Sequence, residues 1–319
     1  MEGLIFSPLF AAAHHPLLAM PAGDASLAAL RRSLAHGQAP LRQLLREHGA
    51  ILLRGFALDG GAADMGACAR DLGAAPYGYV GGNSPRTRVL QDVHTSTEYP
   101  ASETISLHNE MSYLPHWPRR LLFFCQTPAG HGGQTSLASG VDVLRSMPED
   151  IVQQLRTRRI CYLRHFDPAL KLGKSWQQTY QTSDRDELDT ILRAQHSSGS
   201  WTADGKLTVH TVCDAFTRHP DSGAEVWFNQ IEQWHPSALH PKLRALFSAR
   251  AMLAHDCRFG DGGAMNDAFL ARIRHALDQN KLLFDWQKND LLLIDNVLMM
   301  HGREAYTGAR STLAYLSAT

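Results

Sequence analysis

The chain has 319 residues, enough for one large domain or two small ones with a hydrophobic core. Its 31 basic and 31 acidic side chains balance, which excludes the strongly basic character of most nucleic-acid-binding proteins. The five cysteines are scattered without a CxxC pair, so neither a disulfide framework nor a zinc knuckle is expected, and a reducing cytoplasm is the favoured location.

The first third of the chain predicts two strands, two helices and two loops. Residues 1–23 are apolar but contain Glu2 and lack a basic start, which favours a strand and loop over a targeting segment. Leucines at helical spacing predict a helix over 26–49, followed by a buried strand over 50–56 and a short helix over 61–73. The glycine-rich stretch 77–89 predicts an irregular loop.

The remaining pattern is mostly strands, interrupted by helices. Strands are expected over 104–111, 119–127, 132–139, 161–166, 224–234 and in two or three pieces of 284–318; helices over 147–160, 184–197 and 264–280, the last capped by Asn266 or Asp267. No run of about 18 apolar residues predicts a membrane-spanning helix. We expect a single domain over 1–319, mainly β with flanking helices (α+β), built on a closed or double-sheet β architecture.

One short motif suggests metal binding. In "SLHNEM", His108 and Glu110 are two residues apart, and in a strand they would project from the same face. His301, where an apolar strand meets a turn, is the candidate third ligand. Two histidines and one carboxylate form the ligand set of non-haem Fe(II) oxygenases, which leaves positions for a 2-oxo acid and O₂.

A 2-oxo acid also needs a cation for its distal carboxylate. Arg310, nine residues after His301 and expected on the next strand, offers a bidentate guanidinium, and Thr135 of "GGQT" offers a hydroxyl. A second H-x-D/E pair, His165 with Asp167, competes with the first motif but has no GGQT element after it.

The order H-x-E, GGQT, HGR and G-x-R, spread over roughly Tyr79 to Leu316, resembles the TauD/TfdA family of Fe(II)/2-oxoglutarate-dependent oxygenases. It is most similar to the SyrP-like branch of nonribosomal peptide pathways. The resemblance implies a double-stranded β-helix (jelly-roll, cupin-like) fold, with His108, Glu110 and His301 holding Fe(II) and with Thr135 and Arg310 holding 2-oxoglutarate. It further implies O₂-dependent hydroxylation of an amino acid, at Cβ, either free or tethered to a peptidyl carrier protein, in natural-product biosynthesis.

The carboxylate at Glu110 argues against halogenation, since halogenating relatives carry a small residue there. Desaturation or cyclisation at the same iron site stays open, as do a zinc-dependent hydrolase with the same ligands and a β-barrel binding protein with structural histidines. The sequence gives no sign of a nucleic-acid or membrane partner. Candidate substrate contacts are polar residues of the glycine-rich loop and of two strands: Tyr79, Asn83, Ser84, Arg86, Asn109 and Asn229.

Overall fold

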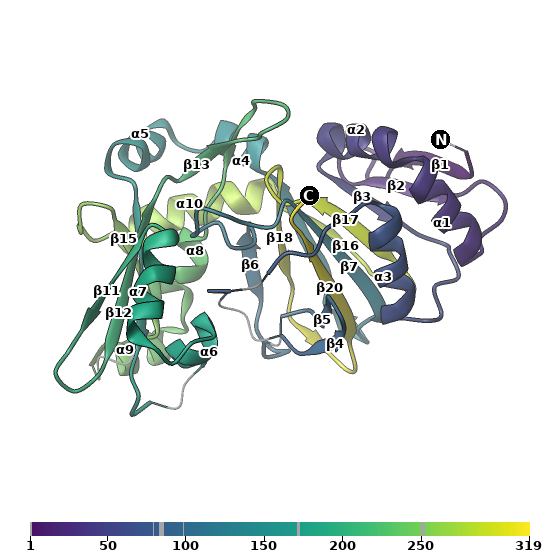
Figure 1. Cartoon of the computed structure of the whole chain (residues 1–319). Helices are drawn as coiled ribbons and strands as arrows, with labels where there is room; N and C mark the ends of the chain where they lie inside the picture. Colours follow the sequence, from purple (N-terminus) through teal and green to yellow (C-terminus); the bar gives the residue numbers. More distant parts are fainter. Residues whose placement is uncertain (1, 79, 83–85, 98, 171–172, 250–252) are drawn as a thin grey trace.

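Two β-sheets form the centre of the molecule in a computed structural model that describes residues 2–78, 80–82, 86–97, 99–170, 173–249 and 253–319 (Figure 1). The larger sheet has eight strands in the order β1 (Leu4–Pro8), β2 (Leu17–Pro21), β3 (Ala50–Leu53), β17 (Leu291–Asp295), β7 (Arg120–Thr127), β20 (Ser311–Ser317), β5 (Val93–Thr95) and β4 (Arg88–Leu90). The smaller has four, in the order β16 (Leu282–Phe284), β9 (Thr135–Ser139), β18 (Met299–Arg303) and β6 (Ile105–His108).

The strand β17 shows why the core lies between layers. Leu291 and Leu293 belong to the cluster shared with the N-terminal helices, whereas Leu292 and Ile294 belong to the cluster shared with the smaller sheet. Successive side chains of a strand point to opposite faces, so a strand covered on both sides is apolar throughout.

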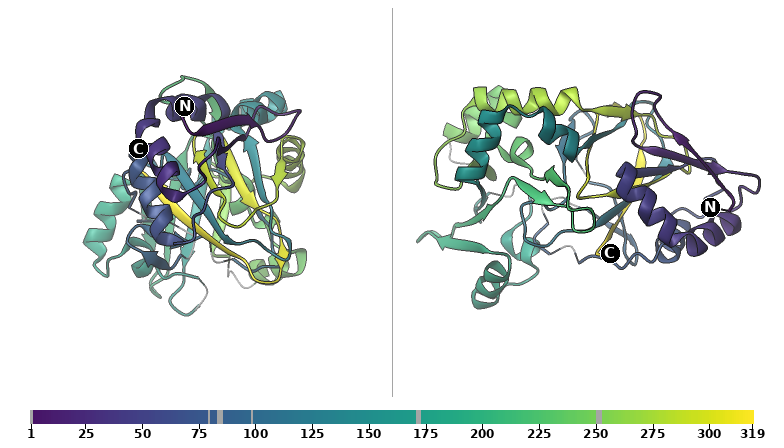
Figure 2. Two further views of the ribbon diagram at one scale, coloured as in Figure 1. Left: turned by 90° about the vertical axis from the view of Figure 1, so that its right-hand side faces the viewer. Right: turned by 90° about the horizontal axis from the view of Figure 1, so that it is seen from above.

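Three helices cover the outer face of the larger sheet: α1 (Leu27–His36), α2 (Gln38–His48) and α3 (Ala62–Asp71) (Figure 1, Figure 2). The single helix expected over 26–49 is therefore wrong, because the chain breaks at Gly37. Pro40 explains the break: it has no N–H to continue the helix, but it is tolerated in the first turn of a new one.

The middle of the chain builds a second lobe, at the left of Figure 1. Its sheet has the order β11 (Ser197–Trp201), β12 (Leu207–Cys213), β10 (Ile160–Phe166) and β15 (His255–Phe259). The remaining helices of the chain are α4 (Gly140–Ser146), α5 (Glu149–Arg158), α6 (Trp176–Tyr180), α7 (Arg185–Ala194), α8 (Ile231–Trp234), the 3-10 helix Pro236–Ala238, α9 (Pro241–Ala249) and α10 (Asp267–Gln279). Two small two-stranded sheets pair β13 (Phe216–Arg218) with β14 (Glu225–Trp227), and β8 (His131–Gly132) with β19 (Tyr306–Thr307).

Two details of this lobe test the predicted elements. Asn266 caps α10, since its side chain accepts a hydrogen bond from the Phe269 N–H at 2.8 Å, as predicted. The strand expected over 224–234 is only three residues long, and a turn of helix, α8, follows it.

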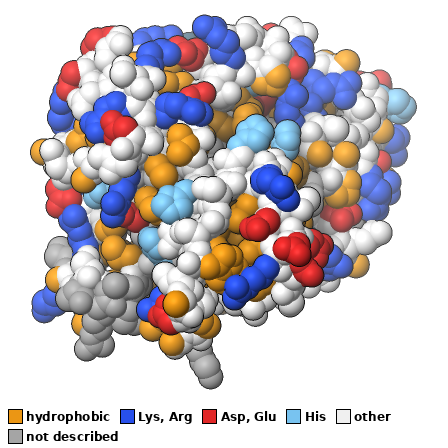
Figure 3. Space-filling model, turned by 60° about the vertical axis from the view of Figure 1, so that its left-hand side comes forward, with side chains coloured by type: hydrophobic (Ala, Val, Ile, Leu, Met, Phe, Trp, Pro, Cys, Tyr) orange, Lys and Arg blue, Asp and Glu red, His pale blue; other side chains and the backbone are white. Residues whose placement is uncertain are grey.

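The architecture is mainly β with flanking helices, the double-stranded β-helix expected from the sequence. Charged side chains of both signs are intermingled over the face shown in Figure 3. Within the described residues, every helix is too short or too polar to cross a bilayer.

Candidate functional site

His108 and His301 face each other across two paired strands. β6 ends at His108, and His301 lies within β18, directly opposite His108 in the antiparallel register. Residues directly opposite on such strands project from the same face. The two buried rings have centroids 4.3 Å apart. The expectation that His301 ends its strand is wrong, because it is the third of five residues in β18.

Glu110 reaches the same place from a turn instead of from a strand. The strand ends at His108, so the shared strand face predicted for His108 and Glu110 is wrong. The buried side chain of Asn296 holds the turn: its Oδ1 accepts from the Glu110 N–H at 2.8 Å, and its Nδ2 donates to the Glu110 carbonyl at 3.0 Å. One ligand atom each of His108, Glu110 and His301 then lies within 4.8 Å of the others.

The electrostatics of the three residues fit a divalent metal. Burial lowers the pKa of His108, and it lowers that of His301 well below its ordinary value, so both rings are neutral and can ligate. The Nδ1 of His108 lies 2.8 Å from the Ser106 carbonyl, which leaves Nε2 for the metal. The buried Nδ1 of His301 has no hydrogen-bond partner among the described residues.

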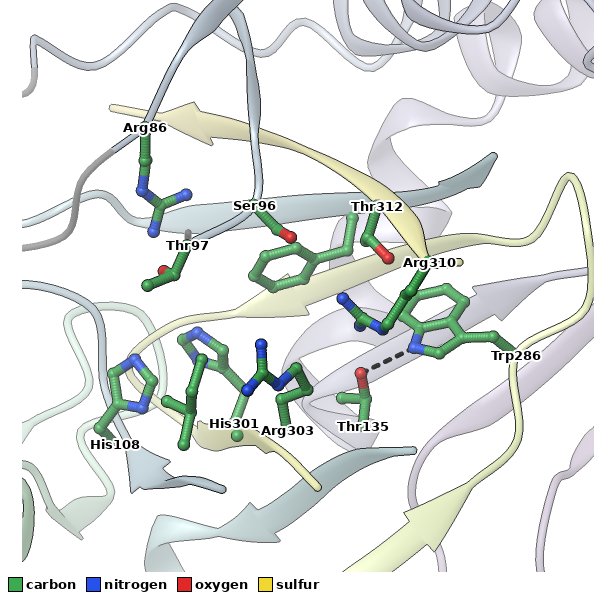
Figure 4. Close-up of a pocket in the computed structure, with 13 residues that line it drawn as sticks. Arg86, Ser96, Thr97, His108, Thr135, Trp286, His301, Arg303, Arg310 and Thr312 are labelled. Carbon is green, nitrogen blue, oxygen red and sulfur yellow. Dashed lines mark hydrogen bonds between the residues drawn. The ribbon is translucent and has the colours of Figure 1, made fainter. Parts of the chain in front are cut away.

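A narrow cavity next to the histidines contains the residues predicted to hold a 2-oxo acid (Figure 4). Thr135 and Arg310 both line it, and the Thr135 Oγ1 accepts a hydrogen bond from the Trp286 indole N–H at 2.9 Å. Arg310 precedes β20 by one residue, instead of lying on it as expected. The other lining residues are Arg86, Ser96, Thr97, Ile105, His108, Phe123, His301, Gly302, Arg303 and Thr312.

Gly133 brings the GGQT turn close to Arg310. Its φ is +73°, and a Cβ there would lie 2.9 Å from the Ala129 Cβ and 3.3 Å from the Arg310 Cδ. A side chain at this position would be strained and crowded, so glycine fits it best.

Of the predicted substrate residues that the structure describes, one lines the cavity and two do not. Arg86 lines the cavity and forms an ion pair of 2.7 Å with Glu110. Asn109 is fully buried and donates to the Asn296 carbonyl, and Asn229 is buried and donates to the Ala215 carbonyl, so neither lines the cavity. Tyr79, Asn83 and Ser84 lie outside the described residues.

The competing H-x-D pair does not form a cluster of metal ligands in the described part of the chain. Asp167 pairs instead with Lys206 at 3.3 Å, and His165 Nδ1 lies 3.1 Å from the Thr208 hydroxyl.

Sequence reasoning did not single out Asn296 or Trp286. Asn296 directly follows the apolar run "LLLID", and an amide at the end of such a core strand is the one sequence signal that could have identified it. In the structure its side chain is fully buried. Trp286 precedes the same strand, and nothing in its sequence surroundings indicates that it contacts Thr135.

Comparison with known proteins gives one family and several relatives. The family model described as "Taurine catabolism dioxygenase TauD, TfdA family" matches residues 13–316. The dapdiamide synthesis protein DdaC of Enterobacter agglomerans is 34% identical over 278 residues, covering 85% of this chain and 83% of DdaC.

Two solved structures share the fold. The structure of PvcB from Pseudomonas aeruginosa matches with a TM-score of 0.59 at 18% identity, over 99% of this chain and 91% of PvcB. An asparagine oxygenase, solved in complex with Fe(II), 2S,3S-3-hydroxyasparagine and succinate, matches with a TM-score of 0.54 at 12% identity, over 92% of this chain and 83% of that one.

Proposed function

Because this chain belongs to the TauD/TfdA family, and is therefore an Fe(II)- and 2-oxoglutarate-dependent dioxygenase, we propose that it hydroxylates an unactivated C–H bond of an amino acid. The observation that carries this proposal is the juxtaposition of His108, Glu110 and His301 with a cavity lined by Thr135 and Arg310. The name of DdaC supports a role in natural-product biosynthesis, and the 3-hydroxyasparagine bound to asparagine oxygenase supports attack at Cβ.

We propose that His108, Glu110 and His301 are the iron ligands. Fe(II) and 2-oxoglutarate supply the oxidising chemistry when bound, since decarboxylation of 2-oxoglutarate to succinate and CO₂ activates O₂ for attack on a C–H bond. Two neutral imidazoles and one carboxylate match the charge and the donor types that this ion requires.

Arg310 and Thr135 are the proposed contacts to 2-oxoglutarate. The Arg310 guanidinium stays charged at neutral pH and offers two parallel N–H donors to the distal carboxylate. Because Thr135 Oγ1 already accepts from Trp286, its own O–H is directed to donate, and a carboxylate is a suitable acceptor. Phe123, Ile105 and Trp286 line the same cavity and give it apolar walls around these polar contacts.

Membership of this family argues against two alternatives that the sequence left open, the zinc-dependent hydrolase and the binding protein. Desaturation or cyclisation begins with the same hydrogen removal, and so these two reactions are separated from hydroxylation by the product alone. We also propose that residues 1–319 act as one oxygenase domain, since the family model matches residues 13–316.

Succinate release tests the proposal. Protein loaded anaerobically with Fe(II) is mixed with 2-oxoglutarate and O₂, alone and with a panel of free amino acids that includes aspartate and asparagine. One amino acid should raise succinate well above background and gain 16 mass units. If only amino acids loaded on a carrier protein do so, the substrate is tethered. Absence of succinate with iron bound would refute the roles of Arg310 and Thr135.

A further inference from the structure

Arg86 and Glu110 form a buried ion pair inside the proposed metal site. The Arg86 Nη2 lies 2.7 Å from the Glu110 Oε2, and both side chains are 4% exposed. Arg86 also lines the same cavity as His108 and His301. The guanidinium therefore lies beside all three proposed ligands, where the charge of a metal would be.

The cavity beside this ion pair is too small for the cosubstrate. It has room of about 40 Å³, which is less than 2-oxoglutarate occupies. Arg86 is one of its lining residues, and 2-oxoglutarate is a much larger molecule. Binding of 2-oxoglutarate therefore requires side chains that line the cavity to move. Arg86 is the lining residue paired with Glu110, and a metal that binds Glu110 would break this ion pair.

We propose that Arg86 takes the place of the metal's charge in the metal-free enzyme and, when metal binds Glu110, turns to an anionic group of the substrate. This inference rests on the proposed function and adds a substrate class to it: an amino acid derivative whose side chain carries a carboxylate close to the C–H bond that reacts.

A second cavity gives Arg86 somewhere to go. Arg86 also lines an adjoining space of about 270 Å³, whose other charged or titratable lining residues are Arg88, Lys174, His94, Asp92 and Tyr77. Three cationic side chains therefore line this space against one carboxylate: Arg86, Arg88 and Lys174 against Asp92. An arginine that turns toward this space enters a positive environment, and an incoming anion relieves the repulsion.

The lining of the metal cavity favours an anion as well. Its charged residues are Arg86, Arg303 and Arg310, and no aspartate or glutamate lines it within the described residues. Arg303 donates to the carbonyls of Tyr99, Pro100 and Glu103, and Arg310 is assigned to 2-oxoglutarate. Arg86 is then the guanidinium best placed for a bidentate pair with a substrate carboxylate.

Metal affinity tests the first half of the proposal without any turnover. Mn(II), a redox-stable probe, is titrated into metal-free wild type and Arg86→Met by calorimetry. Because the variant leaves the Glu110 charge buried without this partner, its metal-free form should melt several degrees lower and it should bind Mn(II) about fivefold or more tightly. Equal or weaker Mn(II) binding by Arg86→Met would overturn the proposal.

Three variants separate the exchange of partners from a general charge effect. Arg119→Met removes one arginine from a surface ion pair with Asp221 and should leave the affinity unchanged. Arg310→Met removes a cavity charge that is not paired with Glu110, so any gain should be smaller than at Arg86. Arg86→Lys keeps the charge and should restore most of the wild-type behaviour. If wild type itself binds no Mn(II), the proposed metal site is wrong, and this result is distinct from failure at Arg86.

The substrate half is tested with acid and amide pairs. Succinate release is compared for aspartate against asparagine and for glutamate against glutamine, each free and carrier-loaded. Arg86→Met should raise KM for the acid about tenfold or more, with kcat changed much less, and should leave the amide nearly unaffected. Equal losses for acid and amide would overturn the assignment of an anionic substrate.

Discussion

At the scale of single residues, the proposed cosubstrate site depends on side chains that come from distant parts of the chain. Thr135 begins β9, Trp286 lies between β16 and β17, and Arg310 precedes β20. Each has a separable task, so single substitutions distinguish loss of the cosubstrate from loss of the metal.

Arg310→Met should raise the KM for 2-oxoglutarate about 100-fold, because a bidentate, charge-assisted contact in a buried site is lost. Succinate release at increasing 2-oxoglutarate measures this, while Mn(II) calorimetry should show that the three metal ligands still bind. A variant with normal KM and impaired Mn(II) binding would place Arg310 in the metal site instead.

Asn296→Ala should weaken both folding and metal binding. The substitution removes the acceptor for the Glu110 N–H and the donor to the carbonyls of Glu110 and Pro118, all buried, so we expect a loss of about 2–4 kcal/mol in the free energy of unfolding. Denaturant titration and Mn(II) calorimetry measure the two effects. Gln153→Ala, at an exposed helical position that donates to Glu149, is the control and should be nearly neutral.

The sequence was sufficient to predict the three proposed ligands but not what holds them. His108 and Glu110 stand in a local motif, and strand patterning indicated His301. The contact of Asn296 with Glu110 spans 186 residues and that of Arg86 spans 24, and neither follows a local period. Such contacts are specified by how strands meet in space, and propensity and periodicity do not report this.

At the scale of elements, the close approach of β6, β18 and β9 sets the distance between the two histidines. Gly302 lies in β18, which pairs with β6 on one side and with β9 on the other. It is opposite Ser136 of β9, and the pairing of β18 with β6 is irregular between His301 and Arg303. A Cβ at this position would collide with the Ile105 carbonyl oxygen and lie 2.5 Å from the Ser136 hydroxyl.

Gly302→Ala should therefore push β6 and β9 away from β18 and separate His108 from His301. We expect about 1–3 kcal/mol of destabilisation from overpacking and a loss of Mn(II) affinity of at least tenfold. Thermal unfolding and calorimetry are the measurements. Gly23→Ala, where an added Cβ meets nothing within 4 Å, should change neither quantity, and equal behaviour of the two variants would show that the strands tolerate the methyl group.

Element prediction succeeded where one face or both faces of an element are apolar and failed where a single residue breaks a period. The strands at 50–53, 120–127 and 160–166 lie within or close to their predicted ranges. Gly37 with Pro40 divided the first predicted helix, and the turn after His108 ended a predicted strand before Glu110. In the second case the tertiary contact with Asn296, rather than local propensity, fixes the backbone.

At the scale of the whole molecule, one buried histidine in the second lobe makes stability depend on pH. Burial, with Arg164 and His165 nearby, lowers the pKa of His255 to about 3. Its ring packs edge-on against Trp234 at 4.7 Å. Between about pH 6.5 and pH 3 the unfolded chain binds a proton at this position and the folded chain does not, so stability falls as the pH falls.

His255→Phe should remove this part of the pH dependence. At pH 7.5, His255 is neutral in both the folded and the unfolded chain. When the pH is lowered from 7.5 to 4, we expect the free energy of unfolding to fall by about 2–3 kcal/mol less in the variant than in wild type. Urea titrations at the two pH values measure the difference, and the comparison at pH 7.5 corrects for any change in packing. Parallel losses in the two proteins would show that His255 is protonated in the folded state.

The position of β20 in the larger sheet has a consequence for biosynthesis. This strand, Ser311–Ser317, is the last of the chain, yet it lies between β7 and β5 in the interior of the sheet. During translation the facing edges of β7 and β5 stay unpaired until Ser311–Ser317 has left the ribosome. We therefore expect the nascent chain to remain open to chaperones until β20 has been made, and iron loading to follow the pairing of this strand.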